Sequence, residues 1–171
     1  MDYLDTSVFL KLISHEDDSA FYRGQLQGKS DLYSSSLLRL EVRSALNRKL
    51  RQRFIEAKSE AALFDAQRLH QLQWCEALRL LREGAPRLVP IDDEIISQAE
   101  SLFFETLPSP SQYTSKLGTS LDGPLKLTSL DAIHLASYRT QGGVMWTADR
   151  ELRVAADRFS VFLGPLPTEA G

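Results

Sequence analysis

The chain has 171 residues, 43% of them hydrophobic, a net charge of −3 at neutral pH and a single cysteine, Cys75. This length and apolar content predict one domain, residues 1–171, while the charge excludes a strongly basic nucleic-acid-binding protein and the lone cysteine excludes an intramolecular disulfide or a thiolate zinc site. No apolar run approaches the roughly 20 residues of a membrane helix, and the first ten residues lack a basic signal start, so we expect a cytoplasmic protein without a membrane segment.

Strand-like and helical patterns alternate along the first hundred residues. The runs DYL (2–4), DLYS (31–34) and RLVPI (87–91) predict strands, and each precedes a helical pattern: TSVFLKLI (6–13), SSLLRLEVRSALNRKL (35–50) and DDEIISQAESLFF (92–104). Residues 54–83 interrupt this alternation, because they read as a helical pair with no strand signal between its members. The pattern therefore predicts an α/β fold with one extra helical segment.

A loop separates these elements from the last part of the chain. Residues 107–126 are rich in Pro, Ser, Gly and Thr, a composition typical of loops. Beyond it, LTSLDAIHLASYRT (127–140) predicts a helix, VMWT (144–147) a strand, ADRELRVAADR (148–158) a helix and FSVFL (159–163) a final strand. Such alternation predicts a mainly parallel sheet covered on both faces, and sheets of this kind hold ligands at the carboxyl ends of their strands.

Four acidic side chains are predicted near the edge of the core. Asp5 and Asp149 each follow a predicted strand, where a carboxylate can cap the next helix or bind a ligand, and capping is the commoner role for either residue alone. Glu41 lies on the apolar stripe of its helix, where an unpartnered carboxylate is rare. Asp131 closes a TSLD capping-box pattern and also points from the first helical turn toward the interior. Two acids at equivalent strand ends favour a shared ligand site over independent caps.

The available side chains restrict the metal that this site can hold. Four carboxylates offer oxygen ligands, which suit Mg²⁺ or Mn²⁺, whereas zinc prefers His or Cys. His134, alone among apolar neighbours, is more typical of a packed structural residue than of a ligand and is left out of the predicted site. A basic stripe that includes Arg39, Arg43 and Arg48 could attract phosphates or could be an ordinary solvated helix face.

Four short motifs resemble those of a known family. YLDTSVFLKL, SSLLRLEVRSAL, LTSLDAIHLA and MWTADREL occur in the order of the motifs of PIN-domain ribonucleases and are most similar to those of VapC-type toxins. The resemblance implies a three-layer α/β/α sandwich and an Mg²⁺- or Mn²⁺-dependent endoribonuclease that is inhibited by a cognate antitoxin. It also implies that Asp5, Glu41, Asp131 and Asp149 form the catalytic metal site, with Thr6 and Thr147 as hydroxyl neighbours that orient them.

Two segments look longer than in compact members of that family. They are the helical segment at 54–83 and the loop at 107–126, and their length leaves open the contacts to RNA and antitoxin and the oligomeric state, a homodimer included. The loop could cover the site or be an insertion without function, and the low cost of long surface loops favours the insertion. The apolar residues from Phe54 to Leu81 offer a groove for a helix of the antitoxin.

Two other functions compete with the nuclease. The first is a PIN-like module that binds RNA or protein without catalysis, against which the presence of all four acids argues. The second is a phosphatase of the haloacid dehalogenase kind, which also begins with a strand-end aspartate but needs a second aspartate where this chain has Ser7. The favoured reaction is hydrolysis of an RNA phosphodiester by a metal-activated water.

Overall fold

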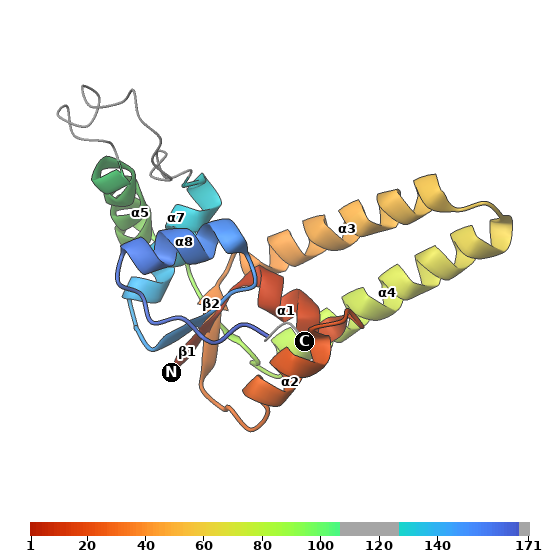
Figure 1. The fold of residues 1–171 in the computed structure, drawn as a ribbon, viewed down its shortest axis with the longest axis horizontal. Coiled ribbons are helices and arrows are strands. Elements are labelled where there is room, and N and C mark those ends of the chain that lie inside the picture. The colour runs from red at the N-terminus through yellow and green to blue at the C-terminus, as the bar shows by residue number, and fades with distance from the viewer. Residues whose placement is uncertain (107–126, 168–171) are drawn as a thin grey trace.

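The computed structural model describes residues 1–106 and 127–167, and this part of the chain contains a parallel four-stranded sheet (Figure 1). Its strands are β1 (Asp2–Leu4), β2 (Leu32–Ser35), β3 (Arg87–Val89) and β4 (Val144–Trp146). Their order across the sheet is β3-β2-β1-β4, so β1 pairs with β2 on one side and with β4 on the other. The predicted α/β class with a parallel sheet is confirmed, and the first and last of the described strands are neighbours.

Helices cover both faces of this sheet. The described helices are α1 (Thr6–Ile13), α2 (Ser19–Leu26), α3 (Leu38–Glu56), α4 (Glu60–Arg82), α5 (Asp93–Thr106), α7 (Ser129–Arg139) and α8 (Arg150–Arg158). Successive strand residues point to opposite faces, so Tyr3 joins an apolar cluster with α5, α7 and α8, while Leu4 joins a second cluster with α1, α2, α3 and part of α4. The fold is therefore the expected three-layer α/β/α sandwich.

The α3–α4 hairpin corrects the boundaries predicted for the extra helical segment. No glycine or proline interrupts the sequence between residues 38 and 83, so α3 continues to Glu56 and α4 is a single helix, rather than a pair within 54–83. Ser59 begins α4 by accepting a hydrogen bond from the Ala62 backbone N–H at 3.2 Å. Figure 1 shows the two helices side by side, projecting from the body of the molecule.

Three further segments differ from the sequence prediction or cannot be compared with it. The sequence reading overlooked α2, and the predicted strand at 159–163 is reduced to one bridge between Leu163 and Met145. Backbone hydrogen bonds from the Met145 N–H to the Phe162 carbonyl at 2.7 Å and from the Gly164 N–H to the Met145 carbonyl at 2.9 Å flank this bridge. The predicted loop at 107–126 lies outside the described residues. None of the described helices has the length and apolar character needed to cross a membrane.

Candidate active site

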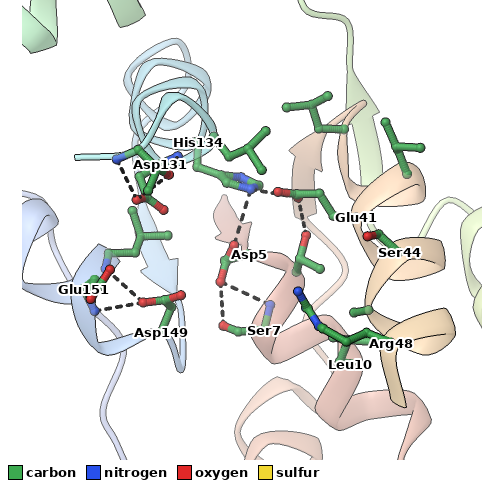
Figure 2. A pocket seen from close by; sticks show the side chains of 17 residues that line it. Asp5, Ser7, Leu10, Glu41, Ser44, Arg48, Asp131, His134, Asp149 and Glu151 are labelled. Atoms are coloured by element: carbon green, nitrogen blue, oxygen red, sulfur yellow. Dashed lines mark hydrogen bonds and ion pairs between the residues drawn. The ribbon is translucent and has the colours of Figure 1, made fainter. Parts of the chain in front are cut away.

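A pocket of about 470 Å³ opens at the carboxyl ends of β1 and β4 and is bounded by α1, α3, α7 and α8. All four predicted acids line it: Asp5, Glu41, Asp131 and Asp149. In the view of Figure 2, Asp5 lies between Asp149 and Glu41. The strand order reverses at β1, because β2 and β3 lie on one side of it and β4 lies on the other. The pocket lies at this reversal, which is where ligand sites of parallel α/β sheets are usually found.

Asp5 is the most buried of the four carboxylates, with only 4% of its surface exposed. It caps α1, since its Oδ2 accepts hydrogen bonds from the Ser7 backbone N–H at 3.1 Å and from the Ser7 hydroxyl at 2.5 Å. The buried Thr147 hydroxyl donates to the same oxygen at 2.9 Å. Ser7 Oγ in turn accepts the Ala148 N–H at 2.8 Å, so the segments that follow β1 and β4 are tied together at Asp5.

Glu41 enters the pocket from the first turn of α3 and is held by two side chains. The Thr6 hydroxyl donates to Glu41 Oε2 at 2.5 Å, and Nε2 of His134 lies 2.9 Å from the same oxygen. Burial raises the pKa of Glu41, but the hydrogen bonds from His134 and Thr6 outweigh burial and bring the pKa below its usual value. At neutral pH Glu41 is therefore an ionised carboxylate.

His134 bridges this carboxylate to the core, although the sequence analysis left it out of the site. Its Nδ1 lies 2.6 Å from the Tyr3 hydroxyl, and its Nε2 lies 3.5 Å from Asp5 Oδ1 as well as next to Glu41. Burial lowers the pKa of His134, but the Tyr3 hydroxyl, Glu41 and Asp5 together raise it well above its usual value. His134 is thus part of the site's hydrogen-bond network rather than an isolated packed residue.

Asp149 is the N-cap of α8, whereas Asp131 lies in the first turn of α7 and bonds back to its N-cap residue Thr128. Asp131 Oδ2 accepts from the Thr128 backbone N–H at 3.1 Å and from its hydroxyl at 2.7 Å, which completes the capping box that the TSLD pattern predicts. Asp149 Oδ1 accepts from the backbone N–H groups of Glu151 at 2.8 Å and of Leu152 at 3.2 Å. The capping and pocket-lining interpretations are therefore compatible at these positions.

Each of the four carboxylates uses one oxygen for its hydrogen bonds to described donors. The second oxygens accept no hydrogen bond from those donors, although His134 Nε2 lies 3.5 Å from the first of them: Asp5 Oδ1, Glu41 Oε1, Asp131 Oδ1 and Asp149 Oδ2. This all-oxygen set fits a hard divalent cation. Within residues 1–106 and 127–167, however, no three His, Cys, Asp or Glu side chains are grouped closely enough to hold a metal ion. A cation held here by one or two carboxylates would complete its coordination with water, as Mg²⁺ commonly does.

The predicted basic stripe points in several directions. Arg48 lines the pocket, whereas the guanidinium of Arg43 stacks 4.8 Å from the centre of the Trp74 ring of α4. Arg39 is exposed on α3 and does not line the pocket. Lys49 binds Glu16, a residue after α1, together with Lys11 of α1. Of the three arginines named from the sequence, the structure therefore brings only Arg48 to the acids.

Thr6 and Thr147 bond to Glu41 and Asp5 respectively, but two further polar residues escaped the sequence analysis. Ser7 was considered only as the place where a second aspartate is missing. His134 had one usable signal, because it follows Asp131 by three residues and so lies on the same side of the helix. Its partners Tyr3 and Glu41 are far away in the sequence, and no local pattern indicates them.

Comparison with known proteins gives one family and two solved structures. The sequence model of the PIN domain family matches residues 3–158. VapC20 of Mycobacterium tuberculosis, a sarcin-ricin loop cleaving toxin, is 15% identical with a TM-score of 0.54 over 98% of this chain and 100% of that chain. VapBC2 of Rickettsia felis, bound to a DNA fragment from its promoter, is 14% identical with a TM-score of 0.49 over 96% of this chain and 98% of that chain. No curated sequence gives a significant match.

Proposed function

The chain belongs to the PIN domain family of nucleases, and from that premise we propose that it is an endoribonuclease that hydrolyses RNA phosphodiester bonds as the toxin of a toxin–antitoxin pair. One observation carries this proposal. Four carboxylates from four separate segments line a single pocket, and each keeps one oxygen that accepts no hydrogen bond from a described donor. We treat residues 1–171 as one nuclease domain acting in the cytoplasm, where its RNA substrate is found.

Asp5, Glu41, Asp131 and Asp149 are the residues that would hold the divalent cation, Mg²⁺ or Mn²⁺. A cation bound there supplies charge neutralisation and a water of lowered pKa for attack on phosphorus. Thr147 and Ser7 hold Asp5, and Thr6 holds Glu41, which limits how these two carboxylates turn. Asp131 and Asp149 are more accessible than Asp5, so either can position the attacking water.

Arg48 is the residue that we assign to the substrate phosphate. Apart from His134, it is the one basic side chain among the described residues that line a pocket otherwise rich in acids. The pocket holds five carboxylates, with Glu151 as the fifth, and a positive charge is needed there to offset their repulsion of a polyanionic substrate. A guanidinium can bind a phosphate through two parallel hydrogen bonds.

A binding module without catalysis is the alternative that the geometry supports. Its support is that the described acids are not grouped closely enough for a ready-made metal site. The geometry does not favour the phosphatase alternative, because that enzyme needs a second aspartate at position 7. Ser7 stands there, bonds to Asp5 and Ala148, and offers no carboxylate.

The decisive experiment is an RNA cleavage assay with purified, antitoxin-free protein. We expect Mn²⁺ or Mg²⁺ to support cleavage, EDTA to abolish it, and added metal to restore it. Asp5→Asn and Glu41→Gln should each remove activity, whereas Asp92→Asn should not, since Asp92 borders α5 and bonds to the Ile95 N–H outside the pocket. Binding of RNA without cleavage under all metal conditions would favour the binding module.

The α3–α4 hairpin is the surface that we assign to the antitoxin. Large apolar side chains are exposed along it, including Ile55 (80%), Phe64 (65%) and Leu72 (58%). Exposed apolar surface of this kind is typical of protein interaction sites. Co-expression with the product of the adjacent reading frame should give a complex that Ile55→Glu and Phe64→Glu weaken together. If the free chain instead forms a stable homodimer through the same residues, the hairpin surface binds a second copy of the chain and not the antitoxin.

A further inference from the structure

We infer that Tyr3 and His134 form a positioning pair that holds Glu41 in the orientation required for metal binding. The inference rests on the proposed metal site and adds two residues that the sequence did not assign to it. Neither residue needs to touch the cation or the RNA, because both act mainly through the Glu41 carboxylate, which lies 2.9 Å from His134 Nε2, whereas Asp5 Oδ1 lies 3.5 Å from it.

Glu41 depends on side-chain partners more than the other three acids do. Asp5, Asp131 and Asp149 are each held by a backbone N–H at the start of a helix: that of Ser7, of Thr128, and of Glu151 with Leu152. Glu41 lies in the first turn of α3 but caps no backbone N–H there, and in the described part of the chain its side chain is held by the Thr6 hydroxyl and His134 Nε2 alone. A glutamate side chain has three rotatable bonds, so removing either partner frees it to leave the site.

The other end of the imidazole is anchored in the core. Tyr3 is completely buried in β1, and its hydroxyl lies 2.6 Å from His134 Nδ1. Its ring makes edge-on contacts with those of Tyr33, at 5.2 Å between centroids, and of His134, at 5.9 Å. The Ser35 N–H also reaches the Tyr3 hydroxyl, at 3.4 Å. The central strand therefore fixes the imidazole, and through it the carboxylate.

The bond to Glu41 does not depend on the charge of His134. When the imidazole is neutral, Nδ1 accepts the Tyr3 hydroxyl proton and the single ring hydrogen is on Nε2. When it is charged, both nitrogens carry hydrogen. In both cases Nε2–H donates to Glu41 Oε2, which leaves Oε1 without a described donor and available to a cation. Hydrogen bonds to a metal-binding side chain are a general means of setting its orientation and metal affinity.

The test compares Mn²⁺ binding of the free protein, measured by calorimetry, in matched variants. His134→Ala and Tyr3→Phe should weaken Mn²⁺ binding, His134→Ala by about 10–100-fold and Tyr3→Phe by less, because the imidazole remains. His134→Gln should recover part of the loss, since its amide can donate to Glu41. Tyr33→Phe is the control: it also removes a buried tyrosine hydroxyl, bonded to the Tyr138 and Gly142 carbonyls, but should leave Mn²⁺ affinity unchanged.

The outcomes separate this inference from the proposed function. Wild-type Mn²⁺ affinity in folded His134→Ala and Tyr3→Phe, with reduced affinity in Glu41→Gln, would overturn the positioning pair and leave the metal site intact. Unchanged affinity in Glu41→Gln itself would instead remove Glu41 from the proposed site. Equal losses in Tyr33→Phe and Tyr3→Phe would mean that general core damage, and not positioning, weakens the metal. Thermal melts of each variant verify that it is folded.

Discussion

Asp149→Asn separates the capping role of this residue, which the structure shows, from the metal-binding role that we propose. Asp149 Oδ1 accepts two backbone N–H groups at the start of α8, and an asparagine oxygen can accept both. Asn and Asp cap helices about equally well, so the metal-free variant should keep its stability to within about 0.5 kcal/mol. Asp149→Ala removes the cap and should cost roughly 1 kcal/mol.

The response to metal should differ far more than the metal-free stability. Mn²⁺ at 100 times its dissociation constant stabilises the native state by about 2.7 kcal/mol, which in a chain of this size raises Tm by roughly 5 to 11 °C. If the Asp149→Asn substitution removes a ligand and affinity falls about 100-fold, the same concentration contributes about 0.4 kcal/mol, or roughly 1 to 2 °C.

Thermal melts with and without Mn²⁺ measure both quantities in one experiment. Asp92→Asn is the matched control, because it changes a carboxylate that also borders a helix start but lies outside the pocket. It should retain the full metal-induced rise in Tm. If Asp149→Asn retains that rise as well, together with RNA cleavage, Asp149 is only a helix cap and the metal site must be assigned without it.

Three further predictions concern other parts of the molecule. Burial works against ionisation of Glu16, but hydrogen bonds from its two lysine partners lower its pKa to about 2. The contribution of ionised Glu16 to stability is therefore complete above pH 4.5 and is lost as the pH falls toward 2. Urea melts should show Glu16→Gln about 1 kcal/mol less stable than the wild type at pH 7, after allowance for solvent screening, and no less stable near pH 2. Gly143→Ala should cost more than about 3 kcal/mol in the same assay, because its Cβ would lie 1.7 Å from a backbone oxygen at a φ of +95°. Arg43→Ala should leave the KM for RNA unchanged, whereas Arg48→Ala should raise it and reduce its salt dependence.

The sequence was sufficient where structure follows from local patterns. Short apolar runs marked all four described strands, and the strand ends placed Asp5 and Asp149 on one edge of the sheet. The position of Glu41 on the apolar stripe of α3 correctly predicted that its side chain points inward, and TSLD correctly predicted the capping box of α7. Each of these features depends on side-chain periodicity or on contacts within a few residues, which a single sequence records directly.

The sequence was insufficient where two distant segments decide the outcome. The partners of His134 are Tyr3 and Glu41, and only the folded chain shows that a β1 tyrosine reaches one imidazole nitrogen and an α3 glutamate the other. The basic stripe is likewise visible in the sequence, but its members contact different parts of the fold. Arg43 stacks on the Trp74 ring of α4, and Lys49 forms an ion pair with Glu16. Tertiary packing also reduced the predicted strand at 159–163 to a single bridge.

The pairing of β1 with β4 has a consequence for when the acidic pocket can form during translation. Asp5 is synthesised well before β4, so its strand cannot pair with β4, nor can its carboxylate meet Thr147 and Asp149, until the segment that contains those residues has been made. At typical synthesis rates this interval lasts roughly 7 to 30 s. A nascent or prematurely terminated chain that stops before Asp149 therefore lacks part of the acidic cluster. Until β4 has been made, the ribosome therefore carries a chain whose acidic pocket is incomplete.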